Sequence, residues 1–182
     1  MTTVTAAKLR TIPSLSGTSP VLDLTRLPAD PVTFFYEWLD GALASQVAEP
    51  LAITLATVDA DGAPNARTLI VKDIDDRGWA FAGPRESAKG IELASHPAAA
   101  LNFWWQPLVR AIRVRGPVVE ASRADSEADF ALRSAAARRD LDSRDWVLWR
   151  LQAERVEFWQ GSPDRQHIRI IYRFIDGVWS LS

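Results

Sequence analysis

The sequence predicts a mainly β protein: a β-rich α+β domain in which an antiparallel barrel carries flanking helices. Two apolar, β-branched segments, 50–58 and 66–72, are joined by the turn Asp59-Ala60-Asp61-Gly62, whose residues favour chain reversal. Further short apolar segments bounded by turn residues continue to the C-terminus, as in antiparallel β proteins. The 182 residues, 47% of them hydrophobic, provide enough apolar surface for one domain.

The chain begins with a segment that lacks apolar periodicity. We interpret residues 1–26 as a mobile arm and residues 27–182 as the single domain. A helix is expected from Pro31, which needs no hydrogen-bond partner for its nitrogen there, with Asp30 as the capping residue. The apolar residues at helical spacing predict a packing helix over the barrel: Val32, Phe35, Leu39 and Ala42.

The hairpin at 50–72 combines a core strand with two cations. The first strand is apolar along nearly its whole length, which predicts burial on both faces. The return strand is bracketed by Arg67 and Lys72. Cations at strand ends are usually solvated. A guanidinium fork and an ammonium group also suit the binding of a phosphate.

A second candidate for anion binding follows a short strand at 79–82. Ser87 stands where a helix over 88–95 should start. The free N–H groups and the dipole of a helix start favour an anion, so Ser87 and Lys89 could bind a phosphate together with Arg67. A solvated helix start with an exposed lysine explains the same residues equally well.

The second half predicts two strands (98–105 and 111–120), a helix from Asp125 with an apolar stripe, and C-terminal strands at 156–160, 167–175 and 178–179. Arg165, His167 and Arg169 alternate in the sequence around the start of the strand 167–175, so we expect them on one face of the sheet. An exposed edge strand is the alternative explanation for His167. Asp176-Gly177 predicts a two-residue hairpin turn.

Composition excludes several classes of function. The 21 basic and 23 acidic residues give no field that would attract nucleic acid or an anionic membrane. Without cysteine, and with two histidines far apart, the chain has a poor set of metal ligands, so we predict no metal. No apolar segment reaches the ~20 residues of a membrane span, and the first 24 residues do not form a signal peptide, which predicts a cytoplasmic protein.

Four segments resemble the pyridoxamine 5'-phosphate oxidase family: LATVDADGAPNARTLIVKDID (55–75), SAKGIELASHP (87–97), WQPLVRAIRVRG (105–116) and FWQGSPDRQHIR (158–169). The resemblance extends from about Leu27 to Trp179. It implies a split β-barrel and a homodimer with flavin mononucleotide (FMN) at the subunit interface. It also implies oxidation of a small molecule by hydride transfer to flavin N5 and reoxidation of the flavin by dioxygen.

The resemblance also assigns roles to individual residues. One chain would bind FMN through Arg67, Thr68, Leu69, Ile70, Lys72, Ser87 and Lys89, and the other through Trp159 and Arg169. Arg165 and His167 would be the catalytic residues. Substrate would contact Lys72, Arg133, Arg165 and His167.

The sequence departs from the family pattern at several of these sites. Ala88 and Ala111 replace an arginine and a glutamine that contact flavin. Asp129 and Ala137 replace a tyrosine and a serine that bind the substrate phosphate, and the stretch 141–155 is shorter than in the family. Three functions therefore stay open: an oxidase of pyridoxine or pyridoxamine 5'-phosphate, a flavin oxidoreductase of another molecule such as a biosynthetic dihydro-aromatic compound, and a non-catalytic protein that binds flavin, deazaflavin or haem.

Overall fold

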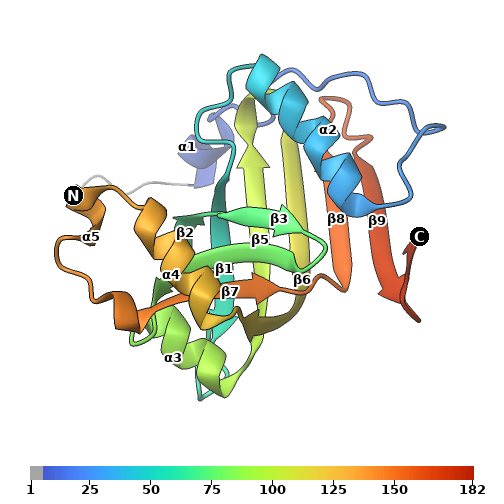
Figure 1. The fold of residues 1–182 in the computed structure, drawn as a ribbon. Coiled ribbons are helices and arrows are strands. Elements are labelled where there is room, and N and C mark those ends of the chain that lie inside the picture. The colour runs from blue at the N-terminus through green and yellow to red at the C-terminus, as the bar shows by residue number, and fades with distance from the viewer. Residues whose placement is uncertain (1–5) are drawn as a thin grey trace.

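The computed structural model describes residues 6–182 (Figure 1). The helices are α1 (Ala6–Arg10), α2 (Pro31–Ala44), α3 (Ala88–Ser95), α4 (Arg123–Leu132) and α5 (Ala135–Arg138), with short 3-10 turns at Gln106–Leu108 and Ser143–Asp145. The strands are β1 (Ala52–Val58), β2 (Pro64–Ile70), β3 (Asp73–Asp75), β4 (Gly78–Pro84), β5 (Ala98–Trp105), β6 (Arg110–Glu120), β7 (Trp146–Leu151), β8 (Arg155–Gln160), β9 (Ile168–Ile175) and β10 (Val178–Leu181).

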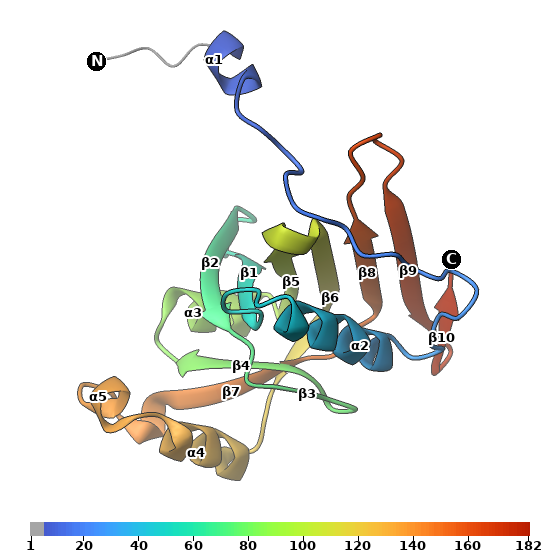
Figure 2. The same ribbon diagram turned by 90° about the horizontal axis from the view of Figure 1, so that it is seen from above.

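All paired strands are antiparallel, and the long strand β6 joins two parts of the sheet. One part has the strand order β10-β9-β8-β6-β5-β1-β2. The end of β6 instead pairs with β7, which pairs with β4, and β4 pairs with β3. The sheet therefore curls into a partly open barrel, as the view from above shows (Figure 2).

Helix α2 covers the concave face of this sheet (Figure 2). As predicted, Asp30 caps it, because its carboxylate accepts from the Thr33 N–H at 2.8 Å. The Phe35 ring packs edge-on to Trp79 at 4.8 Å between centroids, and Trp38 packs edge-on to Phe158 at 5.1 Å. These aromatic contacts connect the helix to both parts of the sheet and form the centre of the core.

The convex face of the sheet is open in the single chain. In β1, Ile53 and Leu55 are at most 1% exposed, whereas Thr54 is exposed. The prediction that this strand is covered on both faces is therefore wrong for one chain on its own. Trp104, on the same convex face, is 48% exposed. Large aromatic side chains are usually mostly buried. The exposed tryptophan therefore fits a face that a second subunit covers.

Two of the larger elements differ from the sequence prediction. Strand β7 was not predicted, although all six of its residues are buried. The helix predicted from Asp125 ends at Leu132 and is followed by the separate short helix α5. Leu132, which the sequence pattern assigned to the apolar stripe of this helix, is 89% exposed. Ser126, not that stripe, is the buried residue of α4, and its hydroxyl accepts from the Leu148 N–H at 3.1 Å.

Part of the predicted N-terminal arm lies against the barrel. The Ser19 hydroxyl donates to the Gly161 carbonyl at 2.5 Å, and the Gln160 side chain donates to the Pro20 carbonyl at 2.9 Å. Helix α1 stands apart from the barrel (Figure 2). The mobility of residues 6–26 stays a prediction, and residues 1–5 lie outside the described part.

Candidate functional site

Arg67 lies at the centre of a polar cluster between β1, β2 and α3. Its guanidinium donates to the Thr57 hydroxyl and, at 2.7 Å, to the Glu92 carboxylate. Asn65 donates to the other Glu92 oxygen at 2.8 Å. Hydrogen bonds from Thr57, Asn65 and Arg67 hold the pKa of the Glu92 carboxyl below its ordinary value, although burial opposes the shift. Glu92 therefore neutralises Arg67.

Lys89 brings a second cation to this cluster. Its ammonium group donates to the Ser87 hydroxyl at 3.0 Å and lies 5.6 Å from the centre of the Trp149 ring. The glycine at position 83 leaves room for it, since a Cβ there would lie 2.1 Å from the Lys89 nitrogen. Burial, and then the charge of Arg67, lower the pKa of Lys89 below its ordinary value.

This cluster fits an anion. Two cations interact there, and Glu92 is the carboxylate that pairs with Arg67, while Lys89 pairs with no carboxylate among residues 6–182. Ser87 precedes α3 as predicted, but its hydroxyl donates to the Pro84 carbonyl instead of capping the helix. The start of α3 therefore keeps N–H groups free for a ligand such as a phosphate.

A second cluster lies on the convex face near the end of β8. The Trp159 ring lies 5.0 Å from the His167 ring and 6.2 Å from the Trp104 ring, centroid to centroid. Trp159 stands opposite Arg169 in the β8–β9 ladder. Three aromatic rings and a guanidinium group thus gather on one exposed surface, which suits a flat ligand that carries negative charge.

The prediction that Arg165, His167 and Arg169 share one face of the sheet holds for His167 and Arg169, which both lie beside Trp159. It is wrong for Arg165, because β9 begins only at Ile168. Arg165 lies in the preceding turn and has a positive φ of 68°. Asp164 stabilises this turn by accepting from the Gln166 N–H at 2.9 Å. The Ser162 N–H donates to His167 Nδ1 at 3.0 Å, which orients the imidazole and leaves Nε2 for a ligand.

Glu157 organises the charges next to this second cluster. It is 1% exposed and pairs with Arg113, with Arg155 at 2.7 Å and with Arg169 at 3.4 Å. Burial alone would raise the pKa of its carboxyl, but these arginines lower it below the ordinary value. Glu157 thereby positions Arg169, a contact that sequence reasoning missed.

The remaining predicted residues fall into three places. Leu69 faces the core side of β2, opposite Ile53, whereas Thr68 and Ile70 are exposed on the other side. Lys72 follows β2 and is exposed. Arg133 directly follows the last residue of α4. Its guanidinium lies over the Trp146 ring, 4.2 Å from the ring centroid.

Asp129 and Arg133 are both held by Trp146. The Asp129 carboxylate accepts from the Trp146 ring nitrogen at 2.7 Å, and Arg133 donates to the Ala137 carbonyl at 3.1 Å. A carboxylate thus lies at the place where the resemblance implies a phosphate-binding tyrosine. A phosphate bound here would be repelled by Asp129.

Arg67 and Arg169, the cations of the two clusters that lie on strands, are near opposite ends of the main sheet. Five strand spacings separate β2, which carries Arg67, from β9, which carries Arg169, roughly 24 Å along the sheet. Figure 1 shows β2 and β9 on opposite sides of the barrel. One chain therefore does not bring together all the residues that the sequence assigned to one site.

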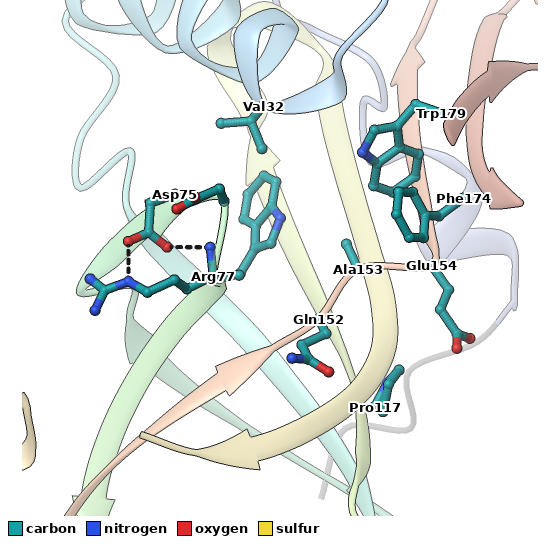
Figure 3. Close-up of a pocket in the computed structure, with 12 residues that line it drawn as sticks. Val32, Asp75, Arg77, Pro117, Gln152, Ala153, Glu154, Phe174 and Trp179 are labelled. Carbon is teal, nitrogen blue, oxygen red and sulfur yellow. Dashed lines mark hydrogen bonds and ion pairs between the residues drawn. The ribbon is translucent and has the colours of Figure 1, made fainter. Parts of the chain in front are cut away.

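A separate cavity of about 410 Å³ lies between the start of α2, the β3–β4 turn and β10 (Figure 3). Its rim includes Val32 and Trp179, and an ion pair between Asp75 and Arg77 at 2.8 Å. None of the predicted site residues lines it.

In residues 6–182, no group of three or more His, Cys, Asp or Glu side chains is placed to hold a metal ion. No helix in the same range is long and apolar enough to cross a membrane.

Comparison with known proteins identifies the family. Residues 39–160 match the family model for pyridoxamine 5'-phosphate oxidase, and residues 146–182 match the model for the pyridoxine 5'-phosphate oxidase C-terminal dimerisation region. The chain belongs to the pyridoxamine 5'-phosphate oxidase family, as the sequence motifs predicted. Its fold is the split barrel of that family, which confirms the predicted fold class.

Individual relatives support this assignment. Pyridoxine/pyridoxamine 5'-phosphate oxidases from Cupriavidus necator and Pseudomonas paraeruginosa are 39% and 36% identical, with 86% and 84% of this chain and 88% and 87% of theirs covered. PhzG from Burkholderia lata 383, solved with tetrahydrophenazine-1-carboxylic acid, superposes with a TM-score of 0.82 at 27% identity, covering 91% of this chain and 98% of that one. An FMN-binding protein of Nostoc punctiforme shares the fold at 20% identity, with a TM-score of 0.68 over 81% of this chain and 95% of its own.

Proposed function

We propose that this protein is an FMN-dependent oxidase that works as a homodimer, with each flavin bound between two subunits. The observation that carries the proposal is the separation of the two clusters. Cations suited to the flavin phosphate lie at β2 and α3, whereas Trp159, His167 and Arg169 lie at the other end of the same sheet. A second copy of the chain can bring its β8–β9 end to the β2 end of the first.

Residues of one subunit would bind the phosphate of FMN. Lys89 and the start of α3 supply positive charge, and Ser87 supplies a hydroxyl. Arg67 has spare guanidinium donors beyond its contacts with Thr57 and Glu92. Thr68, Leu69, Ile70 and Lys72 would border the flavin ring.

The partner subunit would complete the site from its convex face. The match of residues 146–182 to a dimerisation region and the exposed Trp104 on that face both support a homodimer. Trp159 and Arg169 would close over the flavin. Arg165 and His167 would face the substrate, where His167 Nε2 is free to exchange a proton or a hydrogen bond with it.

Bound flavin would supply the redox chemistry, accepting a hydride at N5 and passing the electrons to dioxygen. The chain would contribute position and charge. The aromatic rings of Trp159 and Trp104 would exclude water, and the positive charge of Arg165 would attract an anionic substrate.

The geometry favours a substrate without a phosphate group. Asp129, fixed by Trp146, places negative charge where a substrate phosphate would bind, and Arg133 is engaged with the Trp146 ring and the Ala137 carbonyl. A dihydro-aromatic carboxylic acid fits this arrangement, and the similarity to PhzG in complex with tetrahydrophenazine-1-carboxylic acid supports it. Pyridoxine or pyridoxamine 5'-phosphate is the other candidate, supported by the curated relatives.

Anaerobic flavin bleaching tests the function and separates the two substrates. We expect a dihydro-aromatic carboxylic acid to reduce the protein-bound flavin. Pyridoxine 5'-phosphate should reduce it at least ~100-fold more slowly, the effect expected when a charged group of the substrate has no partner in the site. The Asp129→Tyr variant should gain activity with the phosphate ester, and Asp140→Asn, an exposed change nearby, should not. Rapid bleaching of the unchanged protein by pyridoxine 5'-phosphate would overturn the preferred substrate, and bleaching by neither compound would overturn the assignment as an oxidase of these substrate classes.

The binding of FMN should depend on pH through Lys89. Its pKa lies below the ordinary value of 10.5 in the free protein, and a bound phosphate would raise it again. FMN affinity should therefore fall as the pH rises from neutrality towards 10.5, as Lys89 loses its proton. Fluorescence titrations at several pH values measure this fall, and riboflavin, which lacks the phosphate, corrects for ionisation of the flavin ring.

Lys89→Arg is the matched control for this pH dependence. Arginine stays protonated over the whole range, so the variant should keep its FMN affinity where the wild type loses it. Equal pH profiles for the two proteins would show that Lys89 does not bind the phosphate.

A further inference from the structure

A row of three arginines crosses the convex face at the end of the sheet away from Trp159. Arg115 in β6 stands opposite Arg155 in β8, and Arg155 stands opposite Arg173 in β9. Neighbouring strands are about 4.8 Å apart, so three guanidinium groups share a short stretch of surface. Like charges directly opposite each other destabilise a sheet unless something neutralises them.

The described part of the chain neutralises this row incompletely. Arg155 pairs with Glu157 at 2.7 Å through Nη2, while its Nη1 has no hydrogen-bond partner among residues 6–182. Arg173 donates only to the Ser182 hydroxyl, at 3.3 Å, and the Arg115 side chain makes no hydrogen bond or ion pair with any of residues 6–182. Donors for an oxyanion therefore remain free on all three arginines.

The row borders a cavity of about 820 Å³ that has an apolar wall. The wall is formed by Val58, Pro64, Ala98, Ala99, Ala100, Phe174 and Ile175. Phe174 and Ile175 are 45% and 54% exposed, so they have apolar surface left to bury. Glu154 is the one acidic residue of the lining, which leaves the three arginines in excess.

The cavity is distinct from the candidate flavin site. Arg67, Ser87, Lys89, Trp159 and Arg169 do not line it. Thr57 borders both, since its hydroxyl contacts Arg67.

We propose that this cavity binds a small organic anion, a molecule that carries a carboxylate or a phosphate on an apolar body. The arginines would bind the oxyanion through charge-assisted hydrogen bonds, and the alanine and phenylalanine wall would cover the apolar body. The proposal does not rest on the oxidase function, because Thr57 is the one lining residue shared with the flavin site. It requires that a second subunit leave this end of the convex face open.

Calorimetric titration tests the proposal, with 2-naphthoate, phenyl phosphate and the neutral naphthalene-2-methanol as probes. The titrations are run with FMN added to saturation and again without flavin. We expect at least one of the two anions to bind in both conditions, and the neutral alcohol to bind at least about tenfold more weakly, as the loss of a charged hydrogen bond implies. The stronger of the two anions identifies whether a carboxylate or a phosphate is preferred.

Variants distinguish this cavity from other sites. Arg115→Gln with Arg173→Gln should weaken anion binding about tenfold or more, and Arg115→Lys, which keeps the charge but not the fork, should weaken it less. Arg26→Gln, an exposed change elsewhere, should leave the affinity unchanged, and thermal melting confirms that the variants are folded.

No anion binding at millimolar concentration, or equal binding by the double variant, would overturn the proposal. So would a double variant that alters only subunit association, because the row would then be a contact between subunits.

Discussion

The Lys89→Met variant is expected to lose at least about 2 kcal/mol of FMN binding energy, roughly 30-fold in affinity, because it removes a charged hydrogen-bond donor from the phosphate. Methionine keeps an apolar stem against Trp149, so packing is largely preserved. Lys89 is the better position to test than Arg67, whose removal would leave the buried Glu92 without its cation. Quenching of flavin fluorescence measures the affinity.

Riboflavin provides the internal control for this variant, since it has the same ring but no phosphate. The wild type and Lys89→Met should bind riboflavin equally. If the variant lost riboflavin and FMN to the same degree, Lys89 would act on the ring or on the fold. Unchanged FMN affinity would place the phosphate elsewhere.

The C-terminal motif should separate into two roles. Arg165→Ala and His167→Ala should retain flavin and reduce turnover by ~100-fold or more, the scale on which positioned polar groups act in a transition state. Arg169→Ala should lose flavin instead, because Arg169 lies beside Trp159 and is held there by Glu157. Flavin content and turnover are measured on the same preparations.

The control for this comparison is Arg173→Ala, four residues further along β9 and on the same face, which should change neither flavin content nor turnover. The assignment of roles is wrong if Arg165→Ala and Arg169→Ala behave alike, both retaining flavin or both losing it. The structure sharpens this expectation, since Arg165 lies in a turn and Arg169 in a strand.

Local patterns predicted most of the fold. The cap at Asp30, the start of α3 after Ser87 and the turn at Asp176-Gly177 follow from backbone chemistry that a few neighbouring residues determine. Strand β7 escaped prediction, although its six residues, WVLWRL, are almost entirely apolar. A short apolar segment is ambiguous between a buried strand and a buried helical segment until its neighbours β4 and β6 are known.

The sequence named the candidate residues but did not reveal the contacts between them. The spacing of Arg67 and Lys89 along the chain does not reveal that Glu92 and Thr57 bind Arg67, because that contact needs α3 folded onto β1. The predicted strand began at His167, with Arg165 on the same face, whereas hydrogen bonds within the 162–167 turn hold both residues outside β9. Side-chain hydrogen bonds of this kind compete with regular strand pairing.

The central claim is that each flavin site is shared between two subunits, and mixed dimers test it directly. Lys89→Met and Arg169→Ala subunits, carrying different tags, are produced together, and dimers that contain one of each are purified. Such a dimer has one site with both changes and one site with neither. The shared-site account predicts that it binds one FMN per dimer with wild-type affinity, although each parent dimer binds FMN weakly. Weak binding by the mixed dimer at both sites, like that of the parents, would contradict the account, because it would place Lys89 and Arg169 of the same chain in one site.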